Sequence, residues 1–133
     1  MVKIERITDL FDDVYIEEML SVVEELHVCH WNSARICLNF HEWECIDYAE
    51  GYLICSGDLD IGHAINIYVD NNGVKHYFDI SQESNIKNGY YKDFNNNFEV
   101  VKEYDADEII EIFTNDGEAH LINVQTYKEK EEK

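Results

Sequence analysis

The sequence predicts a single α+β domain in which N-terminal helices pack on an antiparallel sheet. Apolar residues recur at helical spacing from Leu10 to about His27, and a second helical segment extends to Glu44. After Tyr48 the pattern changes to the alternation of apolar and polar residues that is typical of strands. The run Asp70-Asn71-Asn72-Gly73 is a strong hairpin signal, because Asn and Gly tolerate positive φ.

Each element is placed by its own local signal. The first expected helix spans Leu10 to about His27, with Thr8, Asp12 or Asp13 as its capping residue. The second begins at about Cys29 or His30 and ends at Glu44. The third spans Asp105–Phe113 and is capped by Asp105. The expected strands are Tyr48–Ser56, His63–Val69, Val74–Ile80, Phe98–Tyr104 and His120–Tyr127. A polar, Asn-rich surface loop is expected over Ser81–Asn97.

The chain has the size and composition of one folded domain. It has 133 residues, of which 45% are hydrophobic, so it can bury one core without disulfides or metals. It contains no proline, and no Gly/Ser-rich linker divides it. We therefore expect one domain over residues 1–127, followed by a charged tail over residues 128–133.

The charge balance restricts the partners. Ten basic residues stand against 29 acidic ones, which gives a formal net charge of −19. Such a chain should repel nucleic-acid phosphates and anionic membrane surfaces, so we expect no direct nucleic-acid or membrane partner. It should attract basic protein surfaces, although acidity that only aids solubility explains the same composition.

The cysteines and the N-terminal sequence indicate the compartment. The four cysteines, at positions 29, 37, 45 and 55, form no CxxC pair and match no zinc-ligand spacing. The N-terminal segment carries charges throughout, and no run approaches the ~20 apolar residues of a membrane span. We expect a cytoplasmic protein with free thiols and with no cofactor.

Three residues form a candidate catalytic constellation. Cys29 lies where the second helix begins, and a helix N-terminus stabilises a thiolate. His63 begins one strand of the hairpin, and Asp79 lies near the end of the other. A hairpin that closes at Asn71–Asn72 pairs position 63 with about position 80, which brings the two side chains together. Thiol catalysis needs such a nucleophile, a base and an orienting group.

Four short strings strengthen this interpretation. They are C-H-W-N-S-A at 29–34, Y-A-E-G-Y at 48–52, G-H-A-I-N at 62–66 and F-D-I-S at 78–81. In this order they resemble a group of small phage and bacterial proteins with a papain-like or transglutaminase-like fold. The resemblance covers about two fifths of the chain. The chain departs from the usual pattern at Ile65, where the group has an aromatic residue, and at Ile80, where it has proline.

The resemblance implies a role for each matching residue. Cys29 would be the nucleophile, His63 the general base and then acid, and Asp79 the group that orients the imidazole. Asn32 would be a structural or oxyanion-side residue. Glu50 and Tyr52 would line the site or pack beneath it. The resemblance also implies a phage or bacterial source, and host cytoplasm for a phage-encoded chain.

Each of these residues also has a purely structural interpretation. Cys29 would then be an inert buried thiol, His63 a buried structural histidine, and Asp79 a cap at the end of a strand. Glu50 is favoured as a structural residue over a catalytic one. His27, His30 and His41 lie near Cys29 in sequence, but their spacing is not that of a metal site, and we expect no metal.

Three functions are compatible with the sequence. An active constellation predicts acyl transfer through a thioester, on a protein or peptide substrate that includes, as one option, a basic host protein. The second function is a non-catalytic acidic inhibitor, such as a nucleic-acid mimic or an anti-defence protein, that blocks a basic partner. The third is a structural or regulatory module in which the four strings serve packing.

Overall fold

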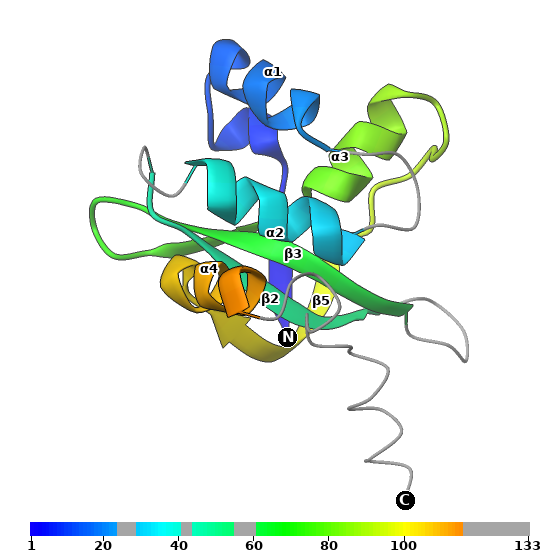
Figure 1. Cartoon of the computed structure of the whole chain (residues 1–133). Helices are drawn as coiled ribbons and strands as arrows, with labels where there is room; N and C mark the ends of the chain where they lie inside the picture. Colours follow the sequence, from blue (N-terminus) through cyan, green and yellow to red (C-terminus); the bar gives the residue numbers. More distant parts are fainter. Residues whose placement is uncertain (24–28, 41–43, 55–60, 116–133) are drawn as a thin grey trace, which may run out of the picture.

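The computed structural model describes residues 1–23, 29–40, 44–54 and 61–115, which form an α+β fold whose sheet closes into a small barrel (Figure 1). The elements of this part of the chain are, in order, β1 (Val2–Glu5), the 3-10 helix η1 (Ile7–Asp9), α1 (Asp13–Ser21), α2 (Cys29–Phe40), β2 (Ile46–Leu53), β3 (Ile61–Val69), β4 (Lys75–Phe78), α3 (Ile80–Lys87), β5 (Asn97–Tyr104) and α4 (Ala106–Asn115). The predicted α+β class is therefore confirmed.

The strand order around the barrel is β1-β4-β3-β2-β5, and β5 closes the ring on β1. Four neighbouring pairs are antiparallel, as expected, but β1 and β4 run parallel. No local signal in the sequence predicts β1. Its four residues are too few to show an alternating pattern, and its partner strands lie far along the chain.

The β3–β4 hairpin forms at the predicted turn. Gly73 N–H donates to the Asp70 carbonyl oxygen at 2.9 Å, and Gly73 has a φ of +79°. The Asp70 carboxylate accepts from two backbone N–H groups of the turn, at 2.9 and 3.0 Å. The strand register pairs Asn66 with Phe78, one position away from the predicted pairing.

Two of the predicted capping residues are confirmed, although the first helix begins at Asp13 rather than at Leu10. The Asp12 carboxylate caps α1 by accepting from Tyr15 N–H at 2.8 Å, and the Asp105 carboxylate caps α4 in the same way at 2.8 Å. The second helix begins at Cys29, one of the two predicted starts. The first helix is shorter than predicted, because it ends at Ser21.

The expectation of a loop over Ser81–Asn97 is wrong, because Ile80–Lys87 forms α3. Helix α3 is unusually polar, yet residues 80–85 are all buried. Ser81, Gln82 and Glu83 form side-chain hydrogen bonds with other segments or with Asp79. Because the buried residues of α3 are mostly polar, its sequence shows no apolar periodicity. The predicted strand His120–Tyr127 and the tail over residues 128–133 lie outside the described residues.

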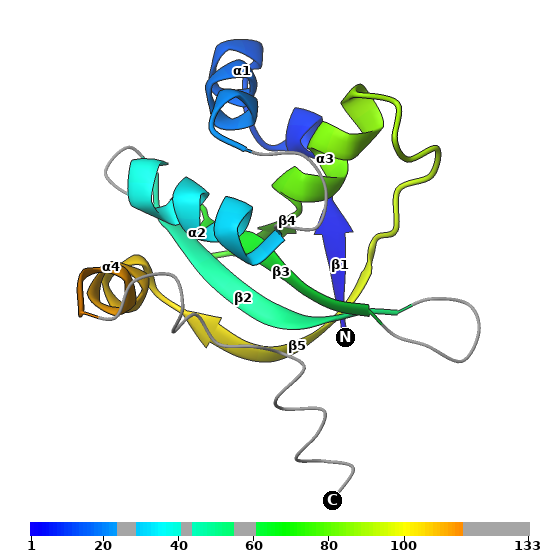
Figure 2. The ribbon, with the colours of Figure 1, turned by 45° about the vertical axis from the view of Figure 1, so that its right-hand side comes forward.

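Two apolar clusters hold the fold together. One lies between the helices and the sheet, where α2 covers β2 and β3 (Figure 2). The other fills the barrel with side chains from β1, β2, β3 and β5, among them Ile65 and Phe98. A search of the described helices finds none with the length and apolar character that crossing a membrane requires.

Candidate active site

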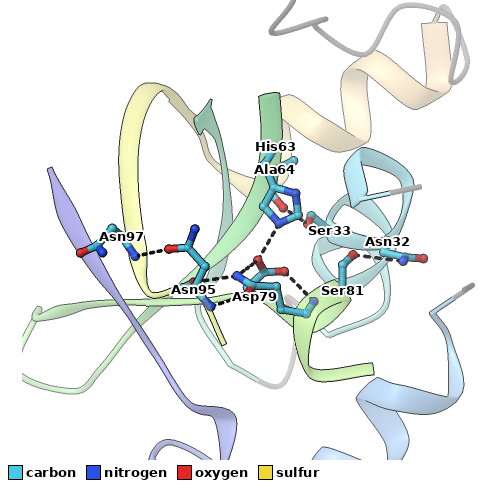
Figure 3. Close-up of polar contacts among 9 residues, drawn as sticks. Asn32, Ser33, His63, Ala64, Asp79, Ser81, Asn95 and Asn97 are labelled. Carbon is cyan, nitrogen blue, oxygen red and sulfur yellow. Dashed lines mark hydrogen bonds and ion pairs between the residues drawn. The ribbon is translucent and has the colours of Figure 1, made fainter. Parts of the chain in front are cut away.

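His63 and Asp79 meet in the buried region between the sheet and helix α3 (Figure 3). His63 Nε2 lies 2.5 Å from Asp79 Oδ2, and the two side chains are 10% and 0% exposed. Strand β3 carries His63, whose ring packs edge-on against Phe98. Asp79 directly follows β4 and is the N-cap of α3. The hairpin therefore brings the two residues together, despite the shift of one position in the register.

The contacts of Asp79 indicate which nitrogen of His63 carries a proton. The backbone N–H of Gln82 donates to Asp79 Oδ1 at 3.1 Å, and the Gln82 side-chain Nε2 donates to Asp79 Oδ2 at 2.7 Å. A carboxylate that accepts from these two donors is suited to accept from His63 as well. On this network His63 Nε2 carries a proton, and Nδ1 is the nitrogen with the basic lone pair in the neutral ring.

The start of α2 lies at the same end of β3 as His63. Ser33 Oγ donates to the Ala64 carbonyl oxygen at 3.0 Å, and Asn66 Nδ2 contacts Cys37 Sγ at 3.4 Å. One turn along α2, from Ser33 to Cys37, therefore matches two residues along β3, from Ala64 to Asn66. The two elements run in the same direction. One turn before Ser33 is Cys29, so its backbone lies alongside about position 62 of the strand.

Asn32 ties α2 to α3 rather than facing an open site. Its Nδ2 donates to Ser81 Oγ at 3.1 Å, and both side chains are buried (Figure 3). Ser81 lies in the first turn of α3, two residues after Asp79. Of the two roles considered for Asn32, this contact supports the structural one, and it holds the first turns of the two helices together.

Glu50 and Tyr52 lie on β2, beside the strand that carries His63. The register pairs Glu50 with Ala64 and Tyr52 with Gly62. Glu50 is fully buried, and Tyr48 Oη donates to one of its carboxylate oxygens at 2.9 Å. Both residues therefore share the face of the sheet that α2 covers, whereas His63 pairs with Gly51 and its side chain lies on the opposite face.

The other described cysteines lie in different environments. Cys37 is buried in the core between α2 and the sheet, and desolvation raises the pKa of its thiol far above the usual range. Cys45 is exposed, although partial desolvation and the charge of Asp47 raise its thiol pKa as well. Neither environment favours a thiolate near neutral pH.

Gln82 also belongs to the site, although it is not among the candidate residues predicted from the sequence. Asp79 and Gln82 have the spacing of an N-cap residue and a polar residue at the third helical position, which is typical of a helix start. This signal lies across the boundary between the expected strand Val74–Ile80 and the expected loop Ser81–Asn97. His27 and His41, two of the three histidines that were weighed as metal ligands, lie outside the described residues.

Comparison of the chain with family models, with curated proteins and with solved structures finds no match.

Proposed function

We propose that this chain is a papain-like or transglutaminase-like thiol enzyme, with Cys29 as nucleophile, His63 as general base and acid, and Asp79 as the residue that orients the imidazole. The observation that carries the proposal is the buried His63–Asp79 pair, in which Asp79 lies two residues before Ser81, the hydrogen-bond partner of Asn32 in the first turn of α2. A carboxylate bonded to one ring nitrogen fixes the ring and favours its protonated form. A helix N-terminus favours a thiolate at its first residue.

The proposed reaction is acyl transfer. The Cys29 thiolate attacks the carbonyl carbon of an amide, and His63 Nδ1 gives its proton to the departing amine, which leaves a thioester. Water or a second amine then attacks the thioester, His63 takes a proton from it, and the thiolate is released. Water gives hydrolysis or deamidation, and an amine gives transamidation. The backbone N–H of Cys29 has no partner within its own helix and is a candidate donor to the oxyanion.

The proposal is tested by the rate at which limiting iodoacetamide alkylates each cysteine of the native protein, mapped by mass spectrometry. At pH 6 a thiol of ordinary pKa is less than about 1% ionised, whereas a thiolate paired with imidazolium is mostly ionised. The lower nucleophilicity of the paired thiolate offsets part of that gain, so we expect Cys29 to react roughly tenfold faster than an ordinary exposed thiol.

Cys45 is the internal reference, because it is an exposed thiol of the same chain, and its raised pKa makes it somewhat slower than an ordinary thiol. The burial of Cys37 makes it unsuitable, since a slow reaction there would report access rather than ionisation. His63→Ala should abolish the advantage of Cys29 over Cys45 at pH 6. Equal rates for Cys29 and Cys45 in the wild-type protein would contradict the proposal.

The charge of −19 favours a second candidate function, a non-catalytic acidic protein that blocks a basic partner. This function predicts partner binding that weakens steeply with salt and survives Cys29→Ser. The enzyme predicts that Cys29→Ser abolishes turnover. A substrate that is itself a basic protein or peptide accommodates the charge within the first proposal.

A further inference from the structure

Gln82 is buried, and its side-chain amide connects two parts of the fold. Its Nε2 donates to Asp79 Oδ2 at 2.7 Å and also to the Asn95 carbonyl oxygen at 2.8 Å. Its Oε1 accepts from Asn95 N–H at 2.8 Å. The paired contacts with one backbone unit define the orientation of the amide, because the reversed amide would place like groups against each other.

Asn95 is in turn held by the sheet. Its Nδ2 donates to the Ile54 carbonyl oxygen at the end of β2 at 3.2 Å, and its Oδ1 accepts from Asn97 N–H at 3.0 Å (Figure 3). A chain of hydrogen bonds therefore runs from the end of β2 through Asn95 and Gln82 to the Asp79 carboxylate, and from there to His63.

We infer that Gln82 is a positioning residue, which holds the Asp79 carboxylate in the orientation that binds His63 Nε2. The two carboxylate oxygens of Asp79 have different partners. Oδ1 caps α3 by accepting from Gln82 N–H, and Oδ2 binds the imidazole of His63. The cap alone fixes only one oxygen. The Gln82 amide binds the same oxygen as His63 and is anchored outside the pair, so it restricts rotation of the carboxylate. The catalytic meaning of this role rests on the proposed function, whereas the effect on His63 does not.

The test is the titration of the His63 ring, followed by NMR correlation of its ring protons and nitrogens. The His63→Gln variant identifies the His63 signals among those of the six histidines. Asp79→Asn removes the negative charge that stabilises the imidazolium, so it should lower the His63 titration midpoint relative to wild type. This fall is the largest effect expected and serves as the reference for the Gln82 variants. Gln82→Met removes the amide at similar length, and it should lower the midpoint in the same direction by a smaller amount.

Glu83→Gln is the matched control. Glu83 is the next residue of α3, and its carboxylate binds Arg6 and Ile7 N–H, each at 2.8 Å, rather than the Asp79 side chain. The variant weakens the docking of α3 and should leave the His63 midpoint unchanged. If Gln82→Met fails to fold, Gln82→Asn keeps an amide that is too short to bind both Asp79 and Asn95, and it should also lower the midpoint.

An unchanged or higher midpoint in the folded Gln82 variant would overturn the inference, as would an equal fall in Glu83→Gln. The two proposals fail separately. A lower midpoint in Gln82→Met together with an unreactive wild-type Cys29 supports the positioning role and rejects the enzyme. A reactive Cys29 together with an unchanged midpoint does the reverse.

Discussion

Gly51 is the position where a single methyl group should disturb the fold most directly. It lies on β2, paired with His63 on one side and with Val100 on the other, next to an irregularity in the β2–β5 pairing. A Cβ atom added there would lie 1.8 Å from the Glu99 carbonyl oxygen and 3.0 Å from a ring carbon of Phe98. The Glu99 oxygen belongs to the backbone, so no side-chain rotation relieves the clash.

The size of the effect follows from this distance. An ordinary contact begins near 3.4 Å, so the gap between β2 and β5 must widen by about 1.6 Å. A ladder hydrogen bond of ~2.9 Å would then exceed ~4 Å and be lost. Two lost bonds contribute about 2 kcal/mol, and the strain of overpacking adds about 1–3 kcal/mol. We expect Gly51→Ala to lower the free energy of unfolding by about 3–5 kcal/mol, a large share of a typical domain's 5–15 kcal/mol.

Urea unfolding followed by circular dichroism measures this loss. Gly73→Ala is the control, because Gly73 has a φ of +79° but no neighbouring heavy atom within 4 Å of an added Cβ. That variant should lose only the ~1–2 kcal/mol of left-handed backbone strain. A loss for Gly51→Ala no larger than that of Gly73→Ala would refute the reasoning from close strand approach.

Three further predictions concern polar contacts. The pKa of His76 is raised, first by its hydrogen bond to Asp70 and then by that to Glu5, at 2.9 and 2.8 Å. A raised folded-state pKa stabilises the fold below the ordinary value of 6.5, and this stability is lost as the pH rises through the folded-state pKa. The difference in unfolding free energy between wild type and His76→Gln should therefore be larger at pH 6 than at pH 9, and a difference that grows with pH would contradict it. Asp105→Ala should destabilise the protein by about 1 kcal/mol in urea unfolding, through loss of the α4 cap, and an unchanged midpoint would show that the cap is dispensable. Asn66→Ala should reduce the unfolding free energy by about 2–4 kcal/mol, because its amide donates to two carbonyl oxygens between α2 and the sheet; a loss below about 1 kcal/mol would argue against this role.

Local interactions are the part of this structure that the sequence predicts well. The Asp70–Gly73 turn and the caps at Asp12 and Asp105 each depend on groups within four residues of one another. The meeting of His63 and Asp79 follows from the same locality, because a hairpin converts a short turn into a cross-strand register. The observed register differs from the predicted one by one residue, and the two side chains still lie within hydrogen-bond distance of each other.

Interactions between distant segments decided the rest. Strand β1 exists because β4 and β5, more than seventy residues away, supply its hydrogen bonds. Helix α3 is held by polar contacts of its buried side chains, such as Glu83 with Arg6 and Gln82 with Asn95, and a pattern of apolar residues does not reveal such contacts. The sequence by itself determined the turn, the caps and the candidate residues. Only the tertiary structure set α2 along β3 and anchored Gln82 on Asn95, because those contacts join segments that are distant in the sequence.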